Sequence, residues 1–177
     1  KLYQYDFQKK TFIKSGIAAQ NVTSVFVDSK KRIWYMCAGS ESVLYRYDNG
    51  KLNTFLASEF NCGRFPQYLS LVEKKNGAIY IATLNGIVEF KNNNFKLHRN
   101  KEGIGTLLLD HDDNIIASYR KWDFILDYEK KDELPDKSRI WYFSNGKFTK
   151  ILSVEGYYIY TFIDNQNIVW VGSPSGL

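Results

Sequence analysis

The residues of this sequence with the greatest chemical potential lie in one polar stretch, residues 119–139. This stretch contains Arg120, Trp122, Asp123 and Asp127. An arginine can pair with an anionic group and a tryptophan ring can stack on a ligand, so Arg120 and Trp122 could hold an anionic or sugar-like molecule. The alternative is that Trp122 and the apolar residues after it pack the stretch against its own sheet or an adjoining domain, which is the more common role of such residues.

The other reactive residues give little support for a catalytic centre. The two histidines, His98 and His111, have no second cluster of ligand-type residues beside them, so a histidine metal site or a Ser/His/Asp triad has little to draw on. Asp123 and Asp127 could form a glycosidase pair, but a single connection would have to hold both of them in place. We therefore expect no catalytic residue, no metal and no cofactor.

The acidic segment at residues 110–114, Asp-His-Asp-Asp-Asn, resembles a calcium loop at first sight. The corresponding segments at residues 28–32, 73–77 and 164–167 read DSKKR, EKKNG and DNQN. They lack the carboxylates that a calcium site needs. We therefore expect a hairpin turn at residues 110–114.

The two cysteines, Cys37 and Cys62, match no CxxC spacing for a metal or a redox pair. A disulfide between them is possible outside the cytoplasm, but buried free thiols are the favoured expectation.

A sequence pattern that occurs about four times along the chain predicts the strands and turns that position these residues. Each copy has a pair of apolar residues, usually Ile or Val followed by an aromatic residue, beginning at Ile33, Ile79, Ile115 and Val169. Five residues before these pairs lie Asp28, Lys74, Asp110 and Asp164. The residues between are rich in Asp, Asn, Lys and Gly, which predicts a tight hairpin turn. In the second copy we expect Glu73 to supply the acidic group through a shift of one residue.

A second hairpin is predicted in the later half of each copy. An aromatic residue is followed five positions later by Leu or Phe, across an Asn-rich turn, at residues 47–52, 90–95 and 143–148. Each full copy therefore contains four strands. In the first copy we place them at residues 22–28, 32–37, 43–47 and 51–56.

A repeat of this size that contains only short strands and turns predicts an all-β fold, the β-propeller, built of four-stranded antiparallel blades. We interpret residues 1–177 as a single propeller segment. Complete blades are expected at residues 22–56, 68–97 and 104–152, the last with the insertion 119–139, and half-blades at residues 1–12 and 158–177. The halves could join to close a small ring, but we favour an excerpt of a larger propeller.

Strand directions alternate within a blade, so the two tight turns lie at one end and the other connections lie at the opposite end. Those other connections are long at residues 57–67, 98–103, 119–139 and 153–157. Long connections on a rigid scaffold commonly carry binding residues. We therefore predict a ligand site on that rim, and the candidate residues are Arg64, Arg120, Trp122, Asp123 and Tyr157.

The net charge is +5 and the isoelectric point is about 9.0. The basic residues lie at separate turns and not on one predicted surface, so we expect no nucleic-acid partner. No apolar run approaches the roughly 20 residues of a membrane helix, so we expect no direct membrane contact by this segment. No signal peptide is visible, which leaves the compartment open for a chain that we interpret as an excerpt.

The sequence pattern of each copy resembles the two-component regulator propeller repeat. In that pattern an apolar run is followed by Asp, a turn, Ile-Trp-x-Gly-Thr/Ser and then Gly-Leu. The match is clearest at residues 162–177, FIDNQNIVWVGSPSGL, and at residues 79–87, IYIATLNGI. The first copy departs from it at residues 34–38, Trp-Tyr-Met-Cys-Ala. The third departs from it at residues 115–118, Ile-Ile-Ala-Ser, which precede the insertion.

That resemblance implies a periplasmic, extracytoplasmic sensor domain of a Bacteroides-type hybrid histidine kinase, responding to a small molecule or an oligosaccharide. Its partners would be other domains of a longer parent chain, through which a homodimer could form. A protein-interaction scaffold is the first alternative. A hydrolase or lyase is the second, but the first strand of each blade offers almost no carboxylates for acid–base chemistry. We therefore expect no enzyme activity from this segment.

Overall fold

The computed structural model describes residues 1–37, 43–63, 65, 70–119, 137–155 and 159–173. Within these ranges the regular structure is β-strand except for one short 3-10 helix, η1 (Ala57–Phe60). The strands are β1 (Tyr3–Asp6), β2 (Thr11–Lys14), β3 (Val22–Val27), β4 (Ile33–Cys37), β5 (Val43–Asp48), β6 (Lys51–Leu56), β7 (Leu71–Glu73), β8 (Ile79–Thr83), β9 (Gly86–Lys91), β10 (Asn94–Arg99), β11 (Thr106–Leu109), β12 (Ile115–Tyr119), β13 (Lys137–Ser144), β14 (Lys147–Glu155), β15 (Tyr160–Ile163) and β16 (Val169–Gly172).

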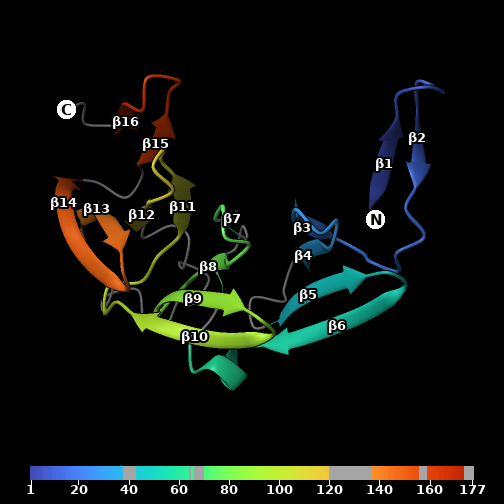
Figure 1. Cartoon of the computed structure of the whole chain (residues 1–177), viewed down its shortest axis with the longest axis horizontal. Coiled ribbons are helices and arrows are strands. Elements are labelled where there is room, and N and C mark those ends of the chain that lie inside the picture. Colours follow the sequence, from blue (N-terminus) through green and yellow to red (C-terminus); the bar gives the residue numbers. More distant parts are fainter. Residues whose placement is uncertain (38–42, 64, 66–69, 120–136, 156–158, 174–177) are drawn as a thin grey trace.

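The strands form three four-stranded antiparallel sheets, β3-β4-β5-β6, β7-β8-β9-β10 and β11-β12-β13-β14. Figure 1 shows these sheets following one another along an open arc, with β3, β7 and β11 on the concave side and β6, β10 and β14 on the convex side. The predicted blade architecture is confirmed, and the four strands predicted for the first copy agree with β3 to β6 to within one residue at each end.

Two two-stranded sheets, β1-β2 and β15-β16, lie at opposite ends of the arc (Figure 1). Among the described strands, no hydrogen-bonded ladder joins these two sheets. The two halves, as far as the structure describes them, do not close a ring.

The second hairpin of each complete sheet has a single geometry, as the constant spacing predicted. Its two turn residues are Asn49-Gly50, Asn92-Asn93 and Asn145-Gly146, and all six φ angles lie between 45° and 87°. Positive φ at both central residues defines the type I′ turn, whose twist matches that of paired strands. Asn and Gly are selected here because they tolerate this region of backbone conformation.

The first hairpin of each complete sheet and the β15-β16 hairpin have turns of the same geometry. In each turn the N–H of the first residue donates to the carbonyl four residues later; these first residues are Asp28, Lys74, Asp110 and Asp164. The fourth residue of each turn has a φ angle of 62° to 76°; these residues are Lys31, Gly77, Asp113 and Asn167. Residues 110–114 therefore form the hairpin turn that the sequence predicted.

Glu73 does not take the acidic position in the second of these turns. Lys74 makes the main-chain hydrogen bonds of that position, and the Asn76 Oδ1 accepts the Ala78 N–H at 3.0 Å. Glu73 instead accepts the main-chain N–H and the hydroxyl of Ser29 in the preceding sheet, at 2.6 and 2.7 Å. The predicted shift of one residue is wrong, because an asparagine inside the turn supplies the acceptor and leaves Glu73 to join two sheets.

The left-handed conformation of Lys31 leads to a prediction about stability. Replacing Lys31 by glycine should raise the free energy of unfolding by about 0.5–1 kcal/mol, because an L-residue at positive φ costs more than the extra chain entropy of glycine. The neighbouring Lys30→Gly change lacks this relief and should destabilise. Urea denaturation of both variants tests the pair, and equal losses of stability in the two would contradict the conformational argument.

The buried side chains lie between consecutive sheets. Trp34 and Leu44 of the first sheet pack with Ile81, Val88 and Phe90 of the second, and all five are at most 3% exposed. A second cluster joins the second and third sheets, and a third cluster joins the third sheet to the β15-β16 hairpin. The sheets are thus stacked face to face, which is the packing that positions their two rims.

Candidate functional site

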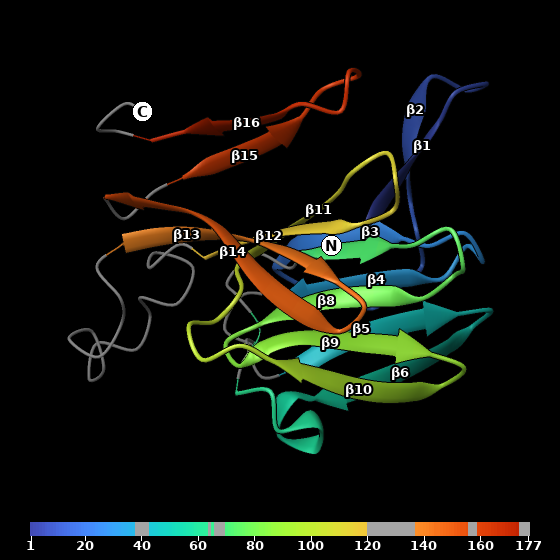
Figure 2. The ribbon, with the colours of Figure 1, turned by 60° about the vertical axis from the view of Figure 1, so that its left-hand side comes forward.

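The long connections lie at the opposite end of the sheets from the tight turns, as predicted. Ile115 pairs with Phe143 next to the turns, and Tyr119 pairs with Arg139 at the far end of the same ladder. Figure 2 shows the hairpin turns of the sheets gathered on one side of the molecule. We call this side the turn rim, and we call the end that carries residues 57–63, 83–86, 98–106 and 137–139 the connection rim.

The five predicted ligand residues, Arg64, Arg120, Trp122, Asp123 and Tyr157, all lie outside the described residues.

Hydrogen bonds tie successive connections together on the connection rim. The Asn85 N–H donates to the Cys62 carbonyl at 3.1 Å, and the Asn85 side-chain amide donates to the Asn61 carbonyl at 3.2 Å. The Asn100 N–H donates to the Asn85 carbonyl at 3.0 Å. Asn85 thus joins the connection before β7 to the one after β10. Because these groups satisfy one another, the rim is an ordered base for the longer connections.

The two ends of the 119–139 connection are anchored. Tyr119 is fully buried at the end of β12. Arg139, near the start of β13, forms an ion pair with Glu102 of the preceding connection, and both side chains are partly exposed. Sequence reasoning did not select Glu102 or Arg139, because the pair joins residues far apart in the chain, although the register Tyr119↔Arg139 would have placed Arg139 on this rim.

Neither cysteine forms a disulfide, as expected, but only Cys62 is buried as predicted, and Cys37 is half-buried. Cys62 is buried beside η1, where its Sγ lies 3.4 Å from the Ala57 carbonyl oxygen. Burial raises the pKa of the Cys62 thiol to about 11, and burial also raises the pKa of Cys37. Both thiols are therefore protonated at neutral pH, and neither is an activated nucleophile.

A cleft of about 310 Å³ on the side of the turn rim lies between the second and third sheets and contains a polar cluster. The His98 Nε2 lies 2.8 Å from the Glu89 Oε2 on the neighbouring strand, and Lys96 is paired opposite Glu89. Burial favours the neutral carboxyl, but hydrogen bonds from His98 and Tyr80 and the charge of Lys96 outweigh it and lower the pKa of Glu89. The pKa of Tyr80 is raised by burial and by the Glu89 carboxylate.

This cluster was missed at the sequence level, where His98 was expected to have no companion. The hairpin register, with Leu97 opposite Val88 and Lys96 opposite Glu89, was the available signal. Glu89 is ionised at neutral pH and accepts hydrogen bonds from two neighbours, so it forms part of a permanently charged hydrogen-bond network. A carboxylic acid that transfers protons near pH 7 has a raised pKa, whereas the pKa of Glu89 is lowered.

In the part of the chain that the structure describes, no three His, Cys, Asp or Glu side chains come together as potential metal ligands. No helix in that part is both long and apolar enough to cross a membrane.

Comparison with protein families finds no match, and no curated protein matches the sequence significantly. Solved structures do match. The extracellular domain of a one component system from B. thetaiotaomicron has a TM-score of 0.66 at 14% identity, covering 95% of this chain and 22% of that chain. A second structure of the extracellular domain of the same protein, there called a hybrid two component system, has a TM-score of 0.62 at 17% identity, covering 97% and 23%. A virginiamycin B lyase from Staphylococcus aureus has a TM-score of 0.55 at 11% identity, covering 92% and 58%.

These likenesses show that the chain has the β-propeller fold. The chain spans 22% of the length of the first of these proteins and 58% of the lyase. The structural neighbours include extracellular domains of the kind that the repeat resemblance named. They also include an enzyme, because propellers support unrelated activities.

Proposed function

We propose that this chain is a ligand-recognition segment of an extracytoplasmic sensor propeller, and that it binds its ligand on the connection rim. The observation that carries the proposal is the 119–139 connection, which leaves the third sheet at a buried Tyr119 and returns at an Arg139 paired with Glu102. The ordered connections around it provide a rigid base for a binding surface. The similarity in fold to the extracellular domain of a B. thetaiotaomicron protein described as a one component or hybrid two component system supports a sensing role.

The ligand class within this proposal is a carbohydrate or another small molecule with hydroxyl and anionic groups. Arg120 and Asp123 would supply hydrogen bonds, Trp122 a stacking surface, and Arg64 and Tyr157 further contacts from the adjacent connections. Other domains of a parent chain would be its partners, with a possible homodimer formed through that chain. Because the stacked sheets are stiff, a bound ligand would act by moving whole domains.

Calorimetric titration with a panel of neutral and acidic oligosaccharides tests this proposal. Arg120→Ala and Trp122→Ala should each weaken binding by about tenfold or more, since each removes a charge-assisted or stacking contact. Lys51→Ala, which changes an exposed residue on the turn rim, is the control and should bind as the unmodified chain does. Failure of every sugar to bind, or equal affinity in all variants, would refute it.

The same panel separates the alternatives. Cleavage of a polysaccharide that disappears on substituting Asp123 or Asp127 would establish an enzyme. Tight association with another protein domain in the absence of any small ligand would establish an interaction scaffold.

A further inference from the structure

A small cleft of about 150 Å³ opens on the turn rim between the first and second complete sheets. Its charged lining residues are Lys30 and Arg32 from the turn before β4, and Lys91 at the end of β9. No carboxylate is among the described residues that line it. A concave site with several cations and no acid carries a positive potential that water and counter-ions must compensate.

The guanidinium of Arg32 is held in place at this cleft. Arg32 is 8% exposed, and its Nε donates to the Asp28 Oδ2 at 2.6 Å. The same oxygen accepts the Trp34 Nε1 at 2.8 Å, and the Asp28 Oδ1 accepts the N–H groups of Lys30 and Arg32. A guanidinium has five N–H donors, and the Asp28 bond uses one of them. Arg32 therefore keeps donor capacity, while its carboxylate partner Asp28 already accepts four hydrogen bonds.

A second guanidinium increases the local excess of positive charge. Arg46 lies over the rings of Trp34 and Phe90, each 5.3 Å from its Cζ, and its Nε and Nη1 are buried without a hydrogen-bond partner in the described part of the chain. Burial lowers the pKa of Arg46, and the charge of Arg32 lowers it further. Asp28 and Asp48 act in the opposite sense on Arg46. Arg32, Arg46, Lys30 and Lys91 carry four positive charges, so these two carboxylates leave an excess of positive charge.

Neutral donors complete the lining. The Asn76 Oδ1 is occupied by the Ala78 N–H, so the NH₂ group of Asn76 is the end that remains for a ligand. Asn92 and Asn93 form the type I′ turn at the edge of the cleft, with φ angles of 51° and 60°. A two-residue hairpin pairs only its flanking residues, so the ladder does not use the N–H groups of Asn92 and Asn93.

The next junction along the arc provides an internal comparison. In the corresponding places between the second and third sheets, Asn76 replaces Lys30, Ala78 replaces Arg32 and Ser144 replaces Lys91. The larger cleft there is lined by Glu89 and Asp113 as well as by lysines. The concentration of cations without acids is therefore particular to the first junction and is not a consequence of the repeated turn.

We propose that the cleft between the first two complete sheets binds a small oxyanion group, such as sulfate, phosphate or a carboxylate. Lys30 and Lys91 would supply charge from the two sheets, and Arg32 would supply directed N–H donors from the floor of the cleft. The volume of about 150 Å³ admits a group of a few heavy atoms. The site lies on the opposite rim from the recognition surface proposed above, so it is independent of that proposal.

Titration of the isotopically labelled chain with sodium sulfate, at ionic strength held constant with sodium chloride, tests the site. The amide signals of Gly77, Asn92 and Asn93 should shift in a saturable manner. Sulfate stabilises folded proteins in general by exclusion from their surface, so the melting temperature should rise more in the unmodified chain than in the variant K30Q/K91Q. The double variant K30Q/K91Q should bind sulfate at least about tenfold more weakly, because it loses two charge-assisted contacts.

The double variant K51Q/K147Q removes two exposed lysines that directly follow the other two type I′ turns, and it is the control with the same change of charge. It should retain the sulfate affinity of the unmodified chain. Unsaturable shifts, identical shifts with chloride alone, or equal sulfate affinity in both double variants would overturn the proposal. The substitutions leave the connection rim unchanged, so oligosaccharide binding in the same variants shows separately whether the proposed function holds.

Discussion

Replacing Asp28 by asparagine is expected to lower the free energy of unfolding by about 3 kcal/mol. The Asp28 Oδ2 accepts the Arg32 Nε and the Trp34 Nε1, and its Oδ1 accepts two main-chain N–H groups. In either orientation of an asparagine amide, the NH₂ group would face two donors. Arg32 would also lose its carboxylate partner while remaining 8% exposed. Urea denaturation followed by tryptophan fluorescence measures the change.

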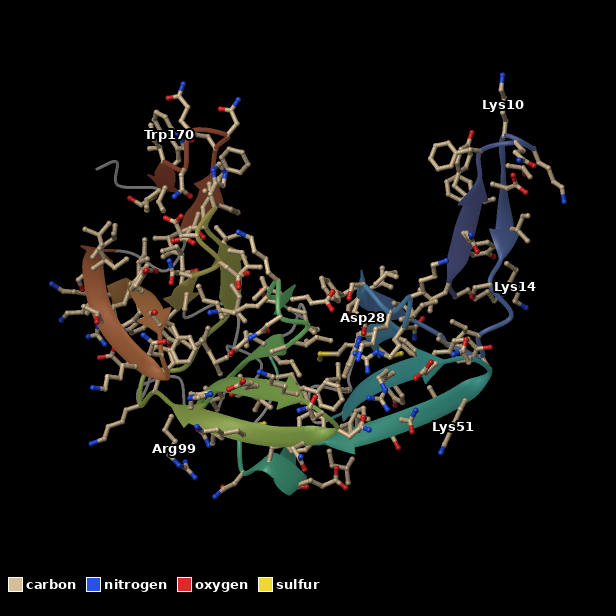
Figure 3. The ribbon with its side chains drawn as sticks, viewed as in Figure 1. Lys10, Lys14, Asp28, Lys51, Arg99 and Trp170 are labelled. Atoms are coloured by element: carbon tan, nitrogen blue, oxygen red, sulfur yellow. The ribbon has the colours of Figure 1, made fainter. Side chains whose placement is uncertain are left out.

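Asp164 provides the matched control for Asp28. Its Oδ2 accepts the Trp170 Nε1 at 2.7 Å and its Oδ1 accepts the Gln166 and Ile168 N–H groups, so the turn is the same. Trp170, which is labelled in Figure 3, lies on the last hairpin. It is 58% exposed, whereas Trp34 is fully buried. Asp164→Asn should therefore have a much smaller effect, because water can satisfy the freed donors. Equal losses in the two variants would contradict the burial argument.

The Asp28 carboxyl also gives the stability a specific pH dependence. Burial alone would raise its pKa, but hydrogen bonds from Trp34 and from the main chain and side chain of Arg32 outweigh it, and the pKa lies below its usual value of 3.8. A lowered pKa in the folded state means that the stabilisation is complete above the unfolded value and is lost as the pH falls through the folded value. The difference between the unmodified chain and Asp28→Asn should therefore shrink below about pH 4.

The hairpins could be predicted from the sequence because local chemistry determines them. Asn49-Gly50 and Asn145-Gly146 specify type I′ turns wherever they occur between strands, and a fixed spacing from an aromatic residue places the strands. The four-stranded sheets and their order follow from joining such hairpins. The rim on which the 119–139 connection begins and ends follows from the alternation of strand direction, and the pairing of Tyr119 with Arg139 agrees with it. The ligand site on that rim stays a prediction, because its candidate residues lie outside the described part of the chain.

Interactions between sheets could not be predicted in the same way. Glu73 was assigned to its own turn, because nothing local shows that Ser29 of the preceding sheet lies next to it. The basic residues were predicted to lie at separate turns, so the cation-rich cleft was not anticipated. Lys30 and Lys91 are 61 residues apart and come together only when two sheets stack. Charge that looks scattered along a repeat can become concentrated at one junction when the copies differ at equivalent positions.

The largest effect of any single methyl group is expected at Gly86, the first residue of β9. Its φ angle is +129°, in a region that is essentially restricted to glycine. A Cβ at this position would overlap the His98 carbonyl oxygen and lie 2.7 Å from the Asn100 nitrogen. Both obstacles are main-chain atoms of the paired strand and of the connection rim, so no side-chain rotation can relieve them.

Gly86→Ala should therefore lower the free energy of unfolding by more than about 3 kcal/mol, through backbone strain together with loss of the β9–β10 pairing. Gly50→Ala is the control, because Gly50 also has positive φ, +87°, but has no atom within 4 Å of an added Cβ. It should cost about 1 kcal/mol, the conformational penalty alone. Thermal and urea denaturation of the two variants measure the difference. Near-equal losses would mean that the connection rim yields to the added methyl group and is not the rigid base that ligand recognition there requires.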